Sequence, residues 1–234
     1  NAIQNTSASF VISDYAKTKY PIVLAHGLFG FNKLGSEAFG LDYWYQIPQD
    51  LARNGANVWI SRQSAANTSE FRGEQLLAEV QDILAITGAQ KVNLIGHSHG
   101  SQSVRYVAGV LPANIASVST IGGPAKGAPL ADTIYKTLAG TPLETPIATI
   151  FNVASNFITL GQLDDPRKYP MNSLGAAYSL STEGAGKFNA MFPAGVPYTA
   201  CGQGDASVNG IRYYSWSGAS VLTNPLDPID YGLT

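Results

Sequence analysis

The ten residues VNLIGHSHGS, Val92 to Ser101, decide how the chain is expected to fold. The first four predict a buried strand, and the segment from Gln102 to Leu111 is predicted to be helical. Between them, Gly96-His97-Ser98-His99-Gly100 matches G-x-S-x-G, in which small residues let a strand and a helix approach closely around a strained turn. The motif alone is weak, but this strand–turn–helix setting makes it credible, so Ser98 is predicted to be a nucleophile.

Strands and helices alternate on both sides of this turn. Strands are predicted at Tyr20–Ala25, Ala56–Ser61, Lys91–Ile95, Ile115–Gly123 and Gly210–Gly218. Helices are predicted over Asp42–Gly55, Glu70–Thr87 and Gln102–Leu111. The alternation indicates an α/β fold with a mostly parallel central sheet and helices on both faces. Active sites in such sheets form beyond the carboxyl ends of the strands, where the loops starting at His26, Gly96 and Gly122 would converge.

A serine that attacks an acyl carbonyl creates an oxyanion, which needs N–H donors aimed at it. We expect the amides of His99, at a helix start, and of Leu28, in the loop after the early strand, to be these donors. His97 and His99 sit inside the turn, where neighbouring side chains point away from the serine side chain. His26 lies in the oxyanion loop and is expected to orient it. None of the three histidines is therefore expected to be the base of Ser98.

Composition and charge bound the class of protein. The chain has 234 residues, 45% of them apolar and 13% charged, with a net charge of -2, which favours one folded domain over a disordered or nucleic-acid-binding chain. No apolar run is long enough to span a membrane, so we expect any membrane contact to be peripheral. The start at Asn1 suggests a removed signal peptide. The single cysteine, Cys201, is either a buried free thiol or half of a disulfide whose partner lies elsewhere.

The stretch from Thr145 to Gly161 is amphipathic but uncharged. Its apolar residues share one helical face, and only Thr, Ser and Asn lie opposite. It is either an ordinary helix that faces the core or a mobile lid whose apolar side meets a lipid surface. We place a candidate lid insertion at residues 134–175 within a single domain, residues 1–234.

Long segments of the chain, in one order from about Tyr15 onward, resemble the secreted, chaperone-dependent true lipases of Pseudomonas, Burkholderia and Acinetobacter. They are KYPIVLAHGLFGF, LDYWYQIPQDLARNGANVW, RGEQLLAEV, KVNLIGHSHG, RYVAGV, SLGAAYSLSTEGAGKFNAMFP, YYSWSG and LTNPLDPID. The resemblance implies an α/β-hydrolase that cleaves long-chain triacylglycerols, with a helical lid, one structural calcium ion and one disulfide. It also implies export through the periplasm, secretion and a dedicated folding chaperone; we expect a monomer.

Individual residues match motifs of this family. Ser98 would be the nucleophile, Arg72 resembles the arginine that braces the oxyanion loop, Asp227 the first calcium carboxylate, and Cys201 the first half of the disulfide. The family's catalytic acid, catalytic histidine, second calcium aspartate and second cysteine follow the segment of Asp227, and this sequence holds none of them. We therefore expect a chain cut short or one piece of a nicked enzyme, without the last strand and helix, and nearly inactive alone. Ser101 stands where the family usually has a second glycine.

Two other functions stay open. A carboxylesterase or polyester depolymerase would use the same serine chemistry on shorter or polymeric acyl groups, whereas Thr145–Gly161 favours interfacial substrates. A non-catalytic lipid-binding protein descended from a lipase would explain the missing base.

Overall fold

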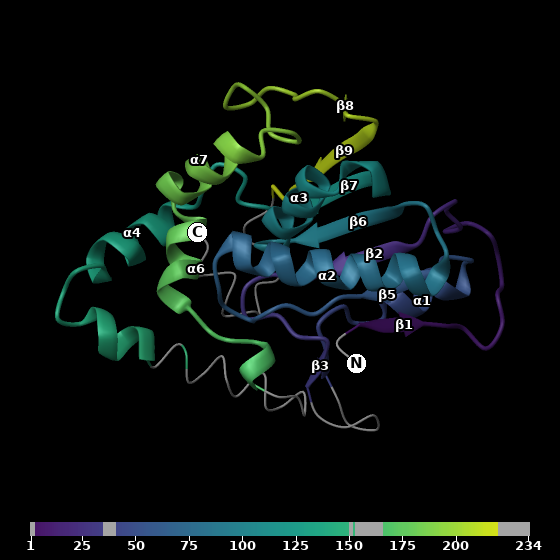
Figure 1. The fold of residues 1–234 in the computed structure, drawn as a ribbon, viewed down its shortest axis with the longest axis horizontal. Coiled ribbons are helices and arrows are strands. Elements are labelled where there is room, and N and C mark those ends of the chain that lie inside the picture. The colour runs from purple at the N-terminus through teal and green to yellow at the C-terminus, as the bar shows by residue number, and fades with distance from the viewer. Residues whose placement is uncertain (1–2, 35–40, 150–151, 153–165, 220–234) are drawn as a thin grey trace.

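The computed structural model describes residues 3–34, 41–149, 152 and 166–219, and a twisted sheet runs through its centre (Figure 1). Seven strands of the described chain form this sheet in the order β1-β5-β2-β6-β7-β9-β8. Their bounds are β1 Gln4–Thr6, β2 Ile22–Ala25, β5 Val58–Ile60, β6 Val92–His97, β7 Ile115–Ile121, β8 Ser207–Val208 and β9 Ile211–Trp216. The five central strands are parallel, and β1 and β8 pair antiparallel at the two edges. The predicted parallel α/β sheet is confirmed.

Helices cover this sheet and the end of it at which the Ser98 turn lies. Their bounds are α1 Ile47–Arg53, α2 Ser69–Thr87, α3 Gly100–Val110, α4 Pro129–Leu138, α6 Ser173–Leu180 and α7 Thr182–Met191. Short pieces add the hairpin β3 Lys33–Leu34 with β4 Leu41–Asp42 and the 3₁₀ turns η1 Pro112–Asn114 and η2 Pro166–Lys168. In Figure 1, α2 and α3 lie across one face of the sheet, and α4, α6 and α7 gather beyond the carboxyl end of β6.

Two apolar cores flank the sheet. The larger joins α2 and α3 to the strands, with Val80, Leu94 and Val104 fully buried. The smaller lies on the opposite face, where Trp44 and Leu51 of the α1 region pack on Val58 and its neighbours. Burial of each such side chain stabilises the fold by about 1.5–3 kcal/mol. Helices on both faces, as predicted, therefore hold the strands that carry the Ser98 turn.

The predicted helix over residues 70–87 is confirmed, with a start one residue earlier. Thr68 caps its first turn by accepting a hydrogen bond from the amide of Phe71. Gly88 ends it in the left-handed conformation, at φ 66°, which a glycine adopts without steric cost. α2 consequently keeps a fixed register under the sheet.

The predicted helix over residues 42–55 is wrong in its first half. α1 begins at Ile47, because Gln46 lies at φ 59° and Pro48 favours the first turn of a helix over its interior. Tyr43 and Trp44 are thereby freed to pack between the sheet and the serine turn. Five further elements were not predicted from the sequence, namely β1, β8, α4, α6 and α7.

The candidate lid insertion, residues 134–175, is described only in part. α4 ends at Leu138, residues 144–149 are helical, and η2 precedes α6. Most of the amphipathic stretch Thr145–Gly161 lies outside the described residues. Across the described part of the chain, no helix has the length and apolarity needed to cross a membrane.

Candidate active site

Ser98 stands at the apex of the turn between β6 and α3. Its backbone is in the left-handed region, at φ 54°, a conformation that costs a non-glycine residue about 1–3 kcal/mol. Its amide donates to the carbonyl of Ile121, which ties the turn to the end of β7. A Cβ at Gly96 would lie 2.3 Å from the Gly100 oxygen, and one at Gly100 would lie 2.4 Å from the Ala25 oxygen. Both glycines of the motif are therefore required by close packing.

The loop that follows β2, residues 26–30, lies directly against this turn. A Cβ at Gly27 would come within 2.7 Å of the Ser98 Cβ, so only glycine allows the approach. Phe29 donates its amide to the carbonyl of Ala65, at 2.7 Å, which fastens the loop to the segment after β5. We call residues 26–30 the oxyanion loop.

Two amides beside Ser98 are free to bind an anion. Within the described ranges, neither the N–H of Leu28 nor that of His99 forms a hydrogen bond. His99 occupies the N-cap of α3, where the helix dipole adds positive potential. Leu28 and Ser98 line the same cavity. This arrangement matches the geometry expected of an oxyanion hole.

Each of the three histidines forms a ring hydrogen bond to a partner other than Ser98. His26 Nε2 accepts from the Gln63 amide at 3.1 Å, and His99 Nε2 lies 2.9 Å from Ser69 Oγ. His97 Nδ1 lies 2.5 Å from the hydroxyl of Tyr43. Burial, with the Arg72 charge nearby, lowers the pKa of His26 to about 3 and that of His99 well below its usual value. All three are thus held as parts of the scaffold.

Arg72 lies fully buried under the oxyanion loop. Its Nη2 donates to the carbonyl of His26, at 2.6 Å, and to that of Gly27, at 3.0 Å. Burial lowers the pKa of Arg72 to about 10, so the guanidinium still carries its charge at neutral pH. This bracing contact is the one that the resemblance implies for Arg72.

An apolar cavity of about 400 Å³ opens beside Ser98. Its walls come from the oxyanion loop, α4, α6 and residues 144–148, and Glu144 is the one charged residue among those that line it in the described chain. Leu130 of α4 lines it and is 71% exposed. Pockets of this size and polarity bind apolar groups in many enzymes.

The remaining predicted site residues are not brought to this centre. Asp227 lies outside the described residues. Across the described ranges, no group of three or more His, Cys, Asp or Glu side chains could hold a metal ion. Cys201 is exposed, so the buried-thiol alternative is wrong: the irregular segment between α7 and β8 runs over the surface.

Sequence reasoning missed two residues near the oxyanion loop. Tyr43 accepts the Gly27 amide at 3.0 Å through its hydroxyl, and no sequence signal marks it. Glu79 is buried and contacts the segment after β5. The sequence did hold a signal for Glu79: it sits between Leu76 and Ile83 on the apolar face of the predicted helix, where burial of a carboxylate is costly.

Known proteins share this sequence and fold. A family model described as alpha/beta hydrolase fold matches residues 20–224. A triacylglycerol lipase of Vibrio cholerae is 48% identical over 220 residues, which cover 94% of this chain and 69% of the relative. A triacylglycerol lipase of Pseudomonas fragi is 41% identical over 229 residues, which cover 95% of this chain and 76% of the relative. The chain belongs to the bacterial triacylglycerol lipases of the α/β-hydrolase family.

A third relative of this lipase, a triacylglycerol lipase of Burkholderia plantarii, is 38% identical, and the match covers 92% of the chain and 61% of the relative. The aligned part of the lipase thus spans roughly two thirds of its relatives. Among solved structures, the mature Bacillus licheniformis lipase BlEst2 is similar, with a TM-score of 0.54, 22% identity and coverage of 82% of this chain and 65% of that one. This likeness shows the fold alone. The resemblance to bacterial true lipases is confirmed.

Proposed function

We propose that the protein hydrolyses long-chain acyl esters of triacylglycerols at lipid–water interfaces through an acyl-enzyme on Ser98. One observation carries the proposal: Ser98 is held in a strained turn, at an apolar cavity, beside two amides that bond no other group among the described residues. The relatives named triacylglycerol lipase support the same reaction class.

In this mechanism, Ser98 Oγ attacks the ester carbonyl carbon, and the carbonyl oxygen becomes an oxyanion bound by the amides of Leu28 and His99. A base takes the Ser98 hydroxyl proton during this attack; collapse then breaks the ester C–O bond, and the base returns that proton to the departing alcohol. Water then attacks the acyl-enzyme and frees the fatty acid, whose chain the apolar cavity accommodates. Since the three histidines have other ring partners, we propose that none of them is the base of Ser98.

The test is Ser98→Ala in the enzyme expressed from its complete coding sequence, assayed on emulsified triolein. Loss of a nucleophile of this kind lowers kcat by about 10⁶-fold. Ser103→Ala is the matched control, because the buried hydroxyl of Ser103 on α3 has no hydrogen-bond partner among the described residues. A Ser98→Ala enzyme as fast as the parent would remove the basis of the proposal.

The preference for long acyl chains rests on the cavity. Its lining is apolar apart from a few groups, and the exposed Leu130 extends the apolar surface outward. We expect kcat/KM to rise with acyl length on a series of esters. A maximum at acetate or butyrate esters would favour a carboxylesterase or polyester depolymerase instead.

Five further expectations rest on the resemblance alone. They are calcium binding, the disulfide, the folding chaperone, secretion through the periplasm and the monomeric state. We propose Asp227 as one calcium ligand and Cys201 as one half of the disulfide. Among the described residues, no three or more His, Cys, Asp or Glu side chains cluster as a metal site, and the ion enters no step of the mechanism. The exposed position of Cys201 is compatible with a disulfide.

A further inference from the structure

Glu79 is a buried carboxylate that the reaction described above does not use. It lies on the sheet-facing side of α2, and only 7% of it is exposed. Its Oε2 accepts two hydrogen bonds of 2.9 Å, from the backbone amide of Arg62 and from the side-chain Nε2 of Gln63. Both donors belong to residues 61–66, which follow β5 and which we call the support loop. A buried carboxylate thus has its hydrogen bonds committed to the support loop.

The support loop in turn holds the oxyanion loop at two points. The Gln63 amide donates to His26 Nε2 at 3.1 Å, and the Ala65 carbonyl accepts the amide of Phe29 at 2.7 Å. Because His26 Nε2 is an acceptor, the ring proton sits on Nδ1, which donates to the Gly27 carbonyl at 2.9 Å. A continuous path of hydrogen bonds therefore runs from Glu79 to the residue that precedes Leu28.

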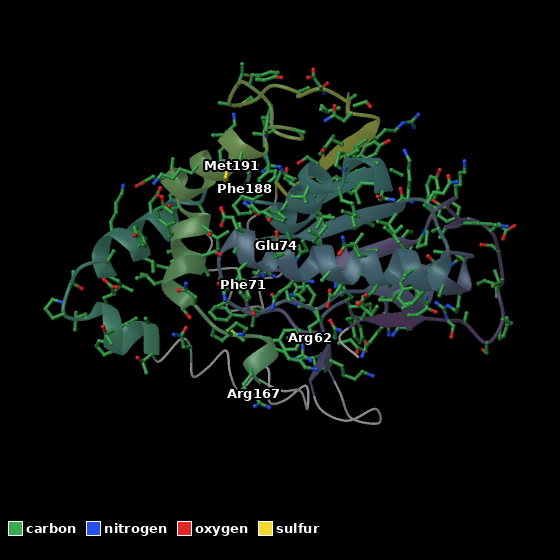
Figure 2. All side chains as sticks on the ribbon, in the orientation of Figure 1. Arg62, Phe71, Glu74, Arg167, Phe188 and Met191 are labelled. Carbon is green, nitrogen blue, oxygen red and sulfur yellow. The ribbon has the colours of Figure 1, made fainter. Side chains whose placement is uncertain are left out.

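The support loop also carries the segment that leads from η2 into α6. The Arg62 guanidinium lies 4.1 Å from the ring centre of Tyr169, and Figure 2 shows Arg62 beneath α2, on the side where η2 runs. The backbone N–H of Asn172 donates to the carbonyl of Ala66 at 2.8 Å. One loop is thus fastened to both the oxyanion loop and a wall of the cavity, and Glu79 fixes its second and third residues, Arg62 and Gln63.

We propose that Glu79 is a positioning residue, which holds the oxyanion loop at its working distance from Ser98 by fixing the support loop against His26. The inference rests on the proposed function, since it concerns the same oxyanion hole. The side chain acts as a hydrogen-bond acceptor. Burial raises the pKa of Glu79 well above its usual value, so the acceptor oxygen matters more than a full negative charge.

Two substitutions separate these properties. Glu79→Gln keeps one acceptor oxygen for both 2.9 Å bonds and replaces Oε1, the acceptor of the longer 3.2 Å bond from the Arg62 amide, by an NH2 group. Glu79→Leu keeps the size and removes both acceptors. Val80→Ala is the matched control, because Val80 is the next residue of α2, is fully buried in the apolar core and has no hydrogen-bonding side chain.

The complete enzyme is assayed for kcat, KM and Tm, and the ring nitrogens of His26 are followed by ¹⁵N NMR, with assignment from a His26→Asn variant. A misplacement of about 1 Å at a reacting centre costs on the order of 100-fold. We expect Glu79→Leu to lower kcat by about that factor with KM within about twofold, while the His26 signal changes from one tautomer to a mixture. We expect Glu79→Gln and Val80→Ala to keep kcat within about threefold and a single tautomer, although Val80→Ala lowers Tm.

Three results would overturn the proposal. These are parent-like kcat and an unchanged His26 tautomer in Glu79→Leu, equal losses of kcat in Val80→Ala and Glu79→Leu, or a Glu79→Gln enzyme as slow as Glu79→Leu. The proposed function fails separately, through an active Ser98→Ala enzyme. In that case the His26 tautomer still reports whether Glu79 positions the loop.

Discussion

Substitution of Gly27 by alanine tests the geometry of the oxyanion loop most severely. The added Cβ would lie 2.7 Å from the Ser98 Cβ, 3.0 Å from the His97 carbonyl oxygen and 3.1 Å from the Tyr43 hydroxyl. Carbon atoms in contact prefer about 3.5–4.0 Å, so the loop must retreat from the serine by about 0.8 Å or more. The amide of Leu28 would move with it.

The expected cost follows from that displacement. Loss of one oxyanion donor lowers kcat by about 10²–10³-fold in serine hydrolases, and a shift of about 1 Å has a similar effect. Gly27→Ala should therefore lower kcat on emulsified triolein by about 10²-fold, with KM nearly unchanged, because the donor acts on the transition state. Tm and far-UV circular dichroism of the complete enzyme verify that the fold persists.

Gly186→Ala is the control for an added methyl group. Gly186 is an exposed residue of α7, and a Cβ there would meet nothing within 4 Å. Its replacement should leave kcat unchanged and stabilise the helix by about 0.5–1 kcal/mol. A Gly27→Ala enzyme with parent kcat would refute the argument that the loop forms one wall of the oxyanion hole.

Three further outcomes are expected. Arg72→Met loses two hydrogen bonds to the carbonyls of the oxyanion loop, so kcat should fall at least about tenfold. It also removes a buried cation, so the free energy of unfolding in urea should change by less than about 2 kcal/mol. An unchanged kcat would contradict the bracing role. The pKa of His26 is about 3 in the folded state, below its ordinary 6.5, so from pH 6.5 down to about 3 the unfolded chain binds a proton that the folded chain does not. As the pH is lowered through this range, His26 should therefore reduce the free energy of unfolding by about 1.4 kcal/mol per pH unit. Urea titrations of His26→Asn should lack this contribution. Equal slopes of unfolding free energy against pH in the parent and the variant would contradict it. If Asp227 binds calcium, EDTA should lower the Tm of the complete enzyme by about 5–10 °C, from about 2.7 kcal/mol of linked stability, and should leave Asp227→Ala unaffected; a parent Tm insensitive to EDTA would remove the calcium proposal.

The sequence predicted those parts of the fold in which local signals and tertiary packing agree. α2 has apolar residues at helical spacing, the Thr68 cap and Gly88 as its stop, and it forms almost as expected. The first half of the predicted helix before Gly55 failed, because Tyr43 and Trp44 have ring contacts with His97 that no local pattern encodes. α6 and α7 escaped notice because small residues and glycines obscure their helical periodicity.

The site divides in the same way. The turn of Ser98 and the place of the two amides beside it follow from a short motif and from the loop after one strand, so the sequence predicted this geometry, whereas their catalytic roles stay a prediction. The supports of the oxyanion loop come from distant segments: Gln63 bonds both His26 and Glu79, and these three residues meet only when α2 has packed on the sheet. Long-range hydrogen bonds of this kind leave at most an indirect trace, such as a carboxylate on an apolar helix face.

The central claim is that Ser98 carries the acyl group, and trapping of the acyl-enzyme tests it most directly. The complete enzyme is mixed with a slowly deacylating long-chain p-nitrophenyl ester, quenched in acid and digested, and the peptides are weighed by mass spectrometry. We expect the added mass of one acyl group on the peptide that contains Ser98, and none in Ser98→Ala. Rapid hydrolysis of triolein with the acyl group on another residue, or with no effect of Ser98→Ala, would contradict it.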